Sequence, residues 1–97
     1  MSTPVAIWEF AWDDQNQEKL YWHGILVADV EALLDGRRVK IRRNKNHRSA
    51  IYKVIGQDRS GRLITVCVEP VSVREGIWRP VTGWPSNESE KNSWGGQ

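Results

Sequence analysis

The chain has 97 residues, and 39% of its side chains are hydrophobic, which suits one small core and is too few for a membrane protein. No apolar run approaches the roughly 20 residues that a membrane-spanning helix needs. The first residues show neither the basic group nor the apolar run of a signal peptide. These features predict one domain over residues 1–84, located in the cytoplasm and without a membrane partner. The single cysteine, Cys67, excludes an intramolecular disulfide and a cysteine-rich metal site.

The net charge of +2 conceals blocks of opposite charge. Residues 1–36 hold seven acidic side chains and one basic one, whereas residues 37–62 hold ten basic side chains and one acidic one. Like charges that lie close together repel one another unless an anionic partner offsets them. The basic block is therefore a natural contact surface for RNA or for an acidic protein, and a merely solvated surface is the third interpretation.

The first part of the chain predicts a strand followed by two short helices. Residues 6–12 are rich in aromatic side chains and show a roughly alternating pattern, which is typical of a strand. Asp14 is a candidate N-cap for a helix that ends near Gly24. Residues 26–34 place their apolar side chains on one helical face, and Gly36 follows them as a stop signal.

The six tryptophans are unusual in so small a chain. Trp8, Trp12 and Trp22 belong to the first predicted strand and helix, and we expect them in the core. Trp78 and Trp84 flank the last predicted strand. At least one of that second pair is a candidate for an exposed anchor to a partner.

The second part of the chain predicts an antiparallel sheet. Its strands are expected at residues 38–42, 50–55, 62–68 and 77–82. The third of these is the most apolar and is expected at the centre. Pro80 cannot donate to a strand ladder, so it indicates an edge position or a bulge in the last strand. Residues 85–97 are polar, and we expect a flexible tail there. The predicted fold is α+β: a strand, a two-helix layer, and a three- to four-stranded antiparallel sheet with one open face.

Strand alternation predicts a polar site on this sheet, because every second side chain shares a face. Lys53, Glu69 and Arg79 converge on one surface if their faces coincide, and Arg62 would lie near its rim. A carboxylate can take the 2′-hydroxyl proton of RNA while cations stabilise the extra charge on phosphorus. Such a group can cleave RNA without a metal. A structural Glu–Arg or Glu–Lys pair is the alternative interpretation.

The polar loop within the basic block supplies a further catalytic candidate. His47 lies there among basic residues and is the second candidate for the acid–base role. The side chains that would hold RNA phosphates are Arg38, Lys40, Arg42, Arg43, Lys45 and Arg48. Two histidines without a cysteine cluster predict no metal site. The chain has no P-loop, dinucleotide fingerprint or nucleophile elbow, so we expect no cofactor.

Several short motifs resemble the BrnT family of toxins from bacterial type II toxin–antitoxin systems. The most specific of them are Phe10-Ala11-Trp12-Asp13 and His23-Gly24-Ile25, and the resemblance continues in more generic strand sequence at Gly61-Arg62-Leu63 and Trp78-Arg79. The resemblance implies a RelE-like fold and a metal-independent endoribonuclease that inhibits translation, with Arg62 and Arg79 as site residues. It also implies a partner, a DNA-binding cognate antitoxin encoded by the adjacent gene. The protein could form an oligomer through this antitoxin.

The end of the chain departs from the family pattern. Where the family's last strand usually continues to Ser-Ala-Arg, this chain has Thr82-Gly83-Trp84. The family's basic C-terminal helix is replaced by acidic, polar sequence. A non-catalytic RNA- or protein-binding module of the same fold is therefore the alternative function.

Overall fold

The structure is a computed structural model that describes residues 6–36, 38–44 and 51–96. The elements follow one another as β1 (Glu9–Phe10), α1 (Asp14–Trp22), α2 (Val27–Glu31), the 3-10 helix η1 (Ala32–Leu34), β2 (Val39–Arg43), β3 (Tyr52–Gln57), β4 (Leu63–Ser72), β5 (Ile77–Pro85) and α3 (Glu88–Gly96). The predicted α+β class is confirmed. None of the helices in the described ranges is long and apolar enough to cross a membrane.

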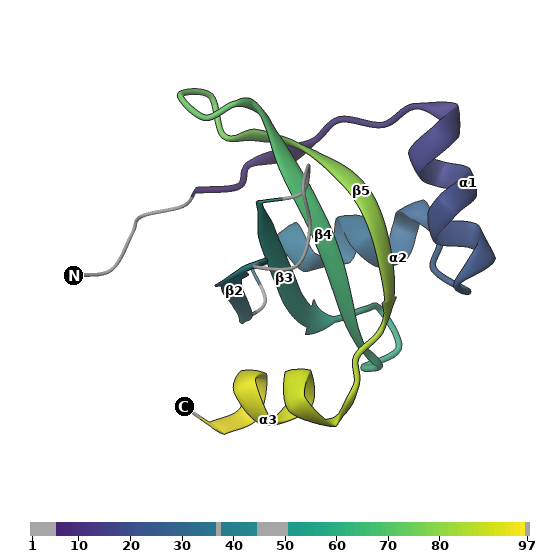
Figure 1. Cartoon of the computed structure of the whole chain (residues 1–97), viewed down its shortest axis with the longest axis vertical. Helices are drawn as coiled ribbons and strands as arrows, with labels where there is room; N and C mark the ends of the chain where they lie inside the picture. Colours follow the sequence, from purple (N-terminus) through teal and green to yellow (C-terminus); the bar gives the residue numbers. More distant parts are fainter. Residues whose placement is uncertain (1–5, 37, 45–50, 97) are drawn as a thin grey trace.

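In the described part of the chain, five strands form one sheet in the order β1-β5-β4-β3-β2 (Figure 1). β1 pairs with β5 in parallel, and the other neighbours are antiparallel. The short β1 makes the sheet larger than the three or four strands expected. The apolar β4 lies at its centre, as predicted. Pro80 is accommodated by a bulge in an inner strand, because Val68 pairs with Pro80 while Cys67 pairs with Thr82.

The start of α1 is fixed by two reciprocal hydrogen bonds. The side chain of Asp13 accepts from the backbone N–H of Asn16 at 2.8 Å, and the side chain of Asn16 accepts from the backbone N–H of Asp13 at 3.0 Å. The N-cap is thus Asp13, one residue before the expected Asp14, because this pair satisfies two free donors at once. Gly24 ends the helix with a φ of +76°, as its position predicts.

The main core lies between the sheet and the layer formed by α1, α2 and η1. The helical layer and its connections contribute Leu20, Ile25, Val30 and Leu33, and the sheet contributes Phe10, Val54, Ile64, Val66, Val68 and Trp78. A glycine allows the close contact between α1 and β5. A Cβ atom at Gly83 would lie 2.8 Å from Cδ2 of Leu20, so a larger residue would push α1 off the sheet.

The expected positions of the tryptophans are wrong in part. Trp78 is only 3% exposed, whereas Trp8 is 75% exposed and Trp22 is 78% exposed. Trp8 precedes the two-residue β1, and Trp22 lies on the outer side of α1, away from the buried Leu20. Short elements bury few positions, so an aromatic composition alone does not identify the core.

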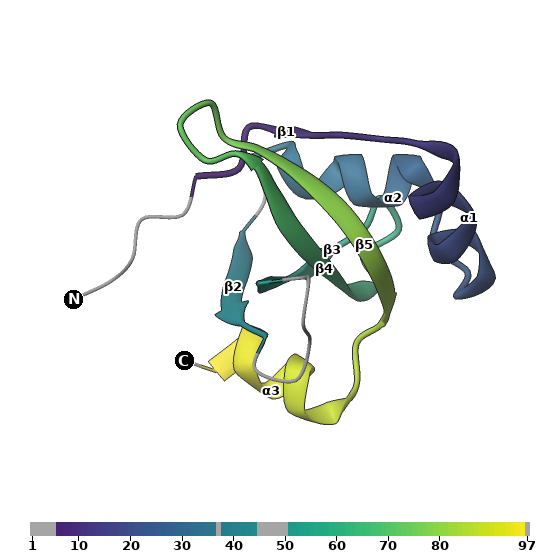
Figure 2. The same ribbon diagram turned by 45° about the horizontal axis from the view of Figure 1, so that its top comes forward.

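The C-terminal segment covers part of the second face of the sheet, opposite α1 and α2, beside β2 and β3 (Figure 2). Its residues form α3 where a flexible tail was expected. The side chain of Asn87 accepts from the N–H of Glu90 at 2.9 Å, and the side chain of Glu90 accepts from the N–H of Asn87 at 2.8 Å. This capping box begins the helix. Ile55 and Cys67, whose side chains lie on this face, are fully buried, so the expectation of an open face is corrected.

Candidate functional site

A glutamate and an arginine on neighbouring strands form an ion pair across the sheet. Glu69 of β4 is opposite Arg79 of β5 in the register. Nη1 of Arg79 donates to Oε2 of Glu69 at 3.1 Å, and the two side chains are 24% and 29% exposed. They share one surface, as strand alternation predicts. Both remain accessible to a ligand.

Arg79 has a second carboxylate partner at the start of α1. Its Nε donates to Oδ2 of Asp13 at 2.7 Å. That hydrogen bond from Arg79, together with the backbone N–H of Asn16, holds the pKa of Asp13 below its ordinary value of 3.8. The same bond raises the pKa of Arg79. Arg79 is therefore a fixed positive charge that links β4, β5 and α1.

Lys53 of β3 lies on the same face of the sheet, opposite Cys67 in the register. Its Nζ is 3.6 Å from Oε2 of Glu90 and 5.9 Å from the centroid of the Trp84 ring. The indole N–H of Trp84 in turn donates to Glu90 at 3.1 Å. The carboxylate that pairs with Lys53 thus comes from α3.

Arg62 lies apart from Glu69, Arg79 and Lys53, although the sequence predicted it near the rim of their shared surface. It precedes β4, and the seven residue steps from it to Glu69 span roughly 23 Å of extended chain. Its Nε donates to Asp58 at 3.0 Å and its Nη2 donates to the carbonyl of Gly24 at 3.0 Å. Asp29 of α2 lies 3.6 Å from the same nitrogen. These contacts tie the β3–β4 turn to the helical layer.

The basic residues expected to hold RNA gather on β2, the outermost strand. Arg42 and Arg43 are exposed, and Lys40 is half-buried. The register puts Lys40 and Arg42 on the face that carries α3 and Arg43 on the opposite face. The guanidinium of Arg38, just before β2, lies 4.0 Å from the centroid of the Trp94 ring. His47, Lys45 and Arg48 lie outside the described residues.

Cys67 is fully buried on the face of the sheet that carries α3. Burial raises the pKa of its thiol to about 11, so the group is neutral near pH 7. The side-chain amide of Asn44 lies 3.7 Å from its sulfur. In the described ranges no three metal-binding side chains come together.

Sequence reasoning missed two carboxylates that shape the site. Asp13 binds Arg79, and Glu90 binds Lys53. Each belongs to a capping box, and the spacings Asp13 to Asn16 and Asn87 to Glu90 are visible in the sequence as helix starts. Their pairing with distant cations carries no local signal, because it depends on how the helices dock on the sheet.

Comparison with known proteins does not assign a function to this chain. No model of a known protein family matches the chain, and no curated protein matches its sequence. The function therefore has to be argued from the side chains that the fold brings together.

Proposed function

We propose that the protein is a metal-independent endoribonuclease with a RelE-like fold. In this proposal it is a BrnT-like toxin of a type II toxin–antitoxin pair that acts in the cytoplasm and inhibits translation by cleaving RNA. The cross-strand pair of Glu69 and Arg79 is the observation that supports the proposal best, because it joins a proton acceptor to a phosphate-binding cation on an accessible surface.

The chemistry follows from this pair. Glu69 accepts the proton of a ribose 2′-hydroxyl, and the 2′-oxygen attacks the adjacent phosphorus. The bond from phosphorus to the 5′-oxygen breaks, the 5′-oxygen takes a proton from solvent, and a 2′,3′-cyclic phosphate remains. Arg79 has five N–H donors. Those not bonded to Asp13 and Glu69 can bind the phosphate oxygens and stabilise the transition state, with Lys53 as the second cation.

The basic strand β2 suits the binding of the RNA chain. Arg42 and Arg43 are exposed there and can neutralise phosphates on both sides of the strand. In the same proposal, a DNA-binding antitoxin encoded next door binds the protein, neutralises it and sets its oligomeric state.

Cleavage of a single-stranded RNA by purified protein in EDTA tests the proposal. We expect products with 2′,3′-cyclic phosphate ends, and Glu69→Gln or Arg79→Ala should lower the rate by about 100-fold. Arg74→Ala, at an exposed arginine in the β4–β5 turn, is the matched control and should cleave like the parent. Circular dichroism checks that each variant is folded, since Arg79 also binds α1.

Two results would overturn the ribonuclease proposal. One is cleavage that neither Glu69→Gln nor Arg79→Ala reduces. The other is a folded parent protein that neither cleaves RNA nor arrests growth when it is expressed without its genomic neighbour.

The ion pairs favour a second function, a non-catalytic binding module. Arg79, Lys53 and Arg62 are each neutralised by carboxylates of the protein itself, which leaves less positive charge for a transition state. Arg42 and Arg43 remain exposed for a ligand. Salt-dependent RNA binding without any cleavage would favour this function over the ribonuclease.

A further inference from the structure

The outer edge of the sheet at β2 presents a row of backbone groups that pair with no other strand in the described part of the chain. The N–H of Asn44 donates to the carbonyl of Ile51 at 2.8 Å, and the register continues without a break into β2 and β3. Hydrogen-bonded pairs alternate with non-bonded pairs along an antiparallel ladder. The N–H and C=O groups of Val39, Ile41 and Arg43 therefore point outward. They bond to no other described backbone group, and such a row is a template for an added strand.

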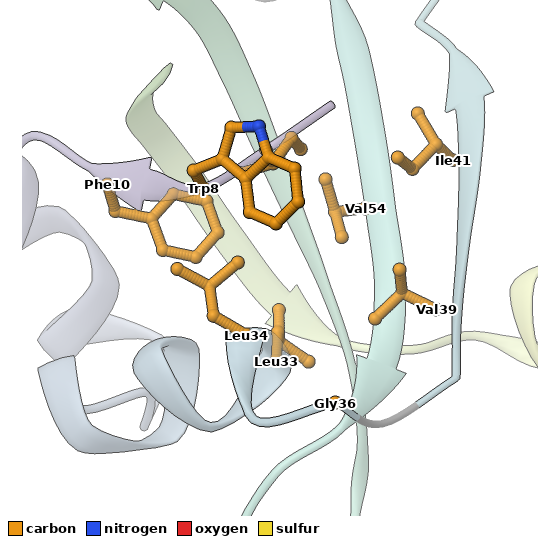
Figure 3. Close-up of a pocket in the computed structure, with 9 residues that line it drawn as sticks. Trp8, Phe10, Leu33, Leu34, Gly36, Val39, Ile41 and Val54 are labelled. Carbon is orange, nitrogen blue, oxygen red and sulfur yellow. The ribbon is translucent and has the colours of Figure 1, made fainter. Parts of the chain in front are cut away.

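The side chains of Val39 and Ile41 in this row line an apolar pocket of about 250 Å³ on the face that carries α1 and α2. Figure 3 shows Val39, Ile41 and Val54 on the strands at the right, with the indole of Trp8 and the side chain of Leu34 to their left. Trp8 is largely exposed although its neighbours are apolar. An exposed aromatic side chain beside an apolar pocket is typical of a contact site for another chain.

The charges around the edge favour an acidic partner. Arg42 and Arg43 are exposed on opposite faces of β2, and Arg38 precedes the strand. If a second copy of the protein paired along this edge, the two basic strands would face each other, and like charges opposite one another are destabilising. A strand with acidic side chains on the Arg42 face would instead meet complementary charge there.

We propose that an extended acidic segment of another protein adds to the sheet beside β2. Alternate residues of such a segment point to opposite faces. Its apolar side chains enter the pocket beside Val39 and Ile41, and its acidic side chains lie beside Arg42 on the other face. Backbone hydrogen bonds supply affinity in this mode and alternating side chains supply specificity. The inference is independent of RNA cleavage, because none of Glu69, Arg79 and Lys53 takes part.

A synthetic peptide of alternating glutamate and valine residues serves as the probe. Hydrogen exchange of individual amides is followed by NMR in the full chain, with and without the peptide. We expect the acidic peptide to slow exchange at Ile41 and Arg43 by about tenfold or more. The already bonded amide of Arg42 should change little. A matched peptide in which lysine replaces glutamate should protect none of them.

Two substitutions of Arg43 distinguish the contribution of its charge to peptide binding from that of its backbone hydrogen bond. Arg43→Ala and Arg43→Pro remove the same charge, but only proline removes the outward N–H. We expect Arg43→Pro to weaken peptide binding about tenfold more than Arg43→Ala does, a difference of about 1.4 kcal/mol. Arg74→Ala should leave the affinity unchanged. Arg42→Glu keeps the backbone intact and should also weaken binding, so the proposal does not depend on the proline variant folding.

Four results would each overturn the proposal. In the first, saturating acidic peptide leaves the Ile41 and Arg43 amides unprotected. In the second, the lysine peptide protects them equally. In the third, both amides are protected in the absence of peptide because the protein forms a dimer, and this protection rises with protein concentration. In the fourth, a short single-stranded RNA protects them and the acidic peptide does not.

Discussion

At the scale of single residues, Asp58 shows how one buried carboxylate organises a turn. It accepts hydrogen bonds from the N–H and hydroxyl of Ser60 at 2.9 and 2.8 Å, and from the N–H and Nε of Arg62 at 2.9 and 3.0 Å. Burial by itself would raise the pKa of Asp58, but the hydrogen bonds from Ser60 and Arg62 outweigh it, so the pKa is lowered from 3.8.

The substitution Asp58→Asn should therefore destabilise the fold. We expect the free energy of unfolding to fall by about 2 to 3 kcal/mol near neutral pH, because charge-assisted hydrogen bonds are lost from a buried group. A lowered folded-state pKa means that the stabilisation is complete above the unfolded value and is lost as the pH falls through the folded one. Urea unfolding at about pH 7 and about pH 3 measures both effects.

The difference between the parent and Asp58→Asn should be smaller at the acidic pH. An equal difference at both pH values would contradict the assigned cause. Asp35→Asn, at an exposed carboxylate after η1, is the matched control and should have little effect at either pH.

At the scale of elements, α3 decides what the second face of the sheet can do. It packs over the face on which Cys67 is buried and supplies Glu90 to Lys53, and the indole N–H of Trp94 donates to the carbonyl of Arg38 at 3.3 Å. Because burial raises the pKa of Cys67 to about 11, only about one thiol in a thousand is ionised near pH 8.

Removal of residues 87–97 should therefore expose a reactive thiol. We expect the rate of labelling by a disulfide reagent near pH 8 to rise by about 100-fold, because the thiol regains both access and its ordinary pKa. Circular dichroism shows whether the truncated chain is still folded. Lys91→Ala, on the exposed side of α3, should label as slowly as the parent, and a truncated protein that labels equally slowly would show that α3 does not cover Cys67.

At the scale of the whole molecule, the basic block divides into charges that form ion pairs with the protein's own carboxylates and charges exposed on the edge strand. Lys53 and Arg62 are engaged in ion pairs with Glu90, Asp29 and Asp58. Arg42 and Arg43 are exposed on the outermost strand. The formal charge of residues 37–62 therefore overstates the charge that an RNA chain would meet.

The salt dependence of RNA binding should reveal this division. Each phosphate neutralised on a single strand contributes about −0.7 to the slope of log K against log salt concentration. We expect Arg42→Ala to reduce the slope by about that amount, and Arg62→Ala to leave the slope unchanged while it lowers the stability of the fold. Fluorescence anisotropy at several salt concentrations measures the slopes. An equal loss of slope in both variants would contradict the division, and Arg74→Ala should match the parent.

The sequence by itself determined the features that depend on neighbouring residues. A capping signal at Asp14 predicted the first helix and apolar periodicity predicted the second, with glycines at 24 and 36 at their ends, and strand alternation predicted that Glu69 and Arg79 share a face. Pro80 indicated an edge position or a bulge, and the structure has the bulge. These are local effects of backbone geometry and side-chain spacing, which a short stretch of sequence contains in full.

Only the tertiary structure decided which distant groups meet. Arg62 was expected near the sheet site and instead binds Asp58, Asp29 and the end of α1. The polar C-terminal segment became α3 and covered part of the face that was expected to be open, beside β2 and β3. The basic stretch became an edge strand beside an apolar pocket. Each outcome depends on strand register and on how helices dock across the sheet, and both are set by packing between residues far apart in the chain.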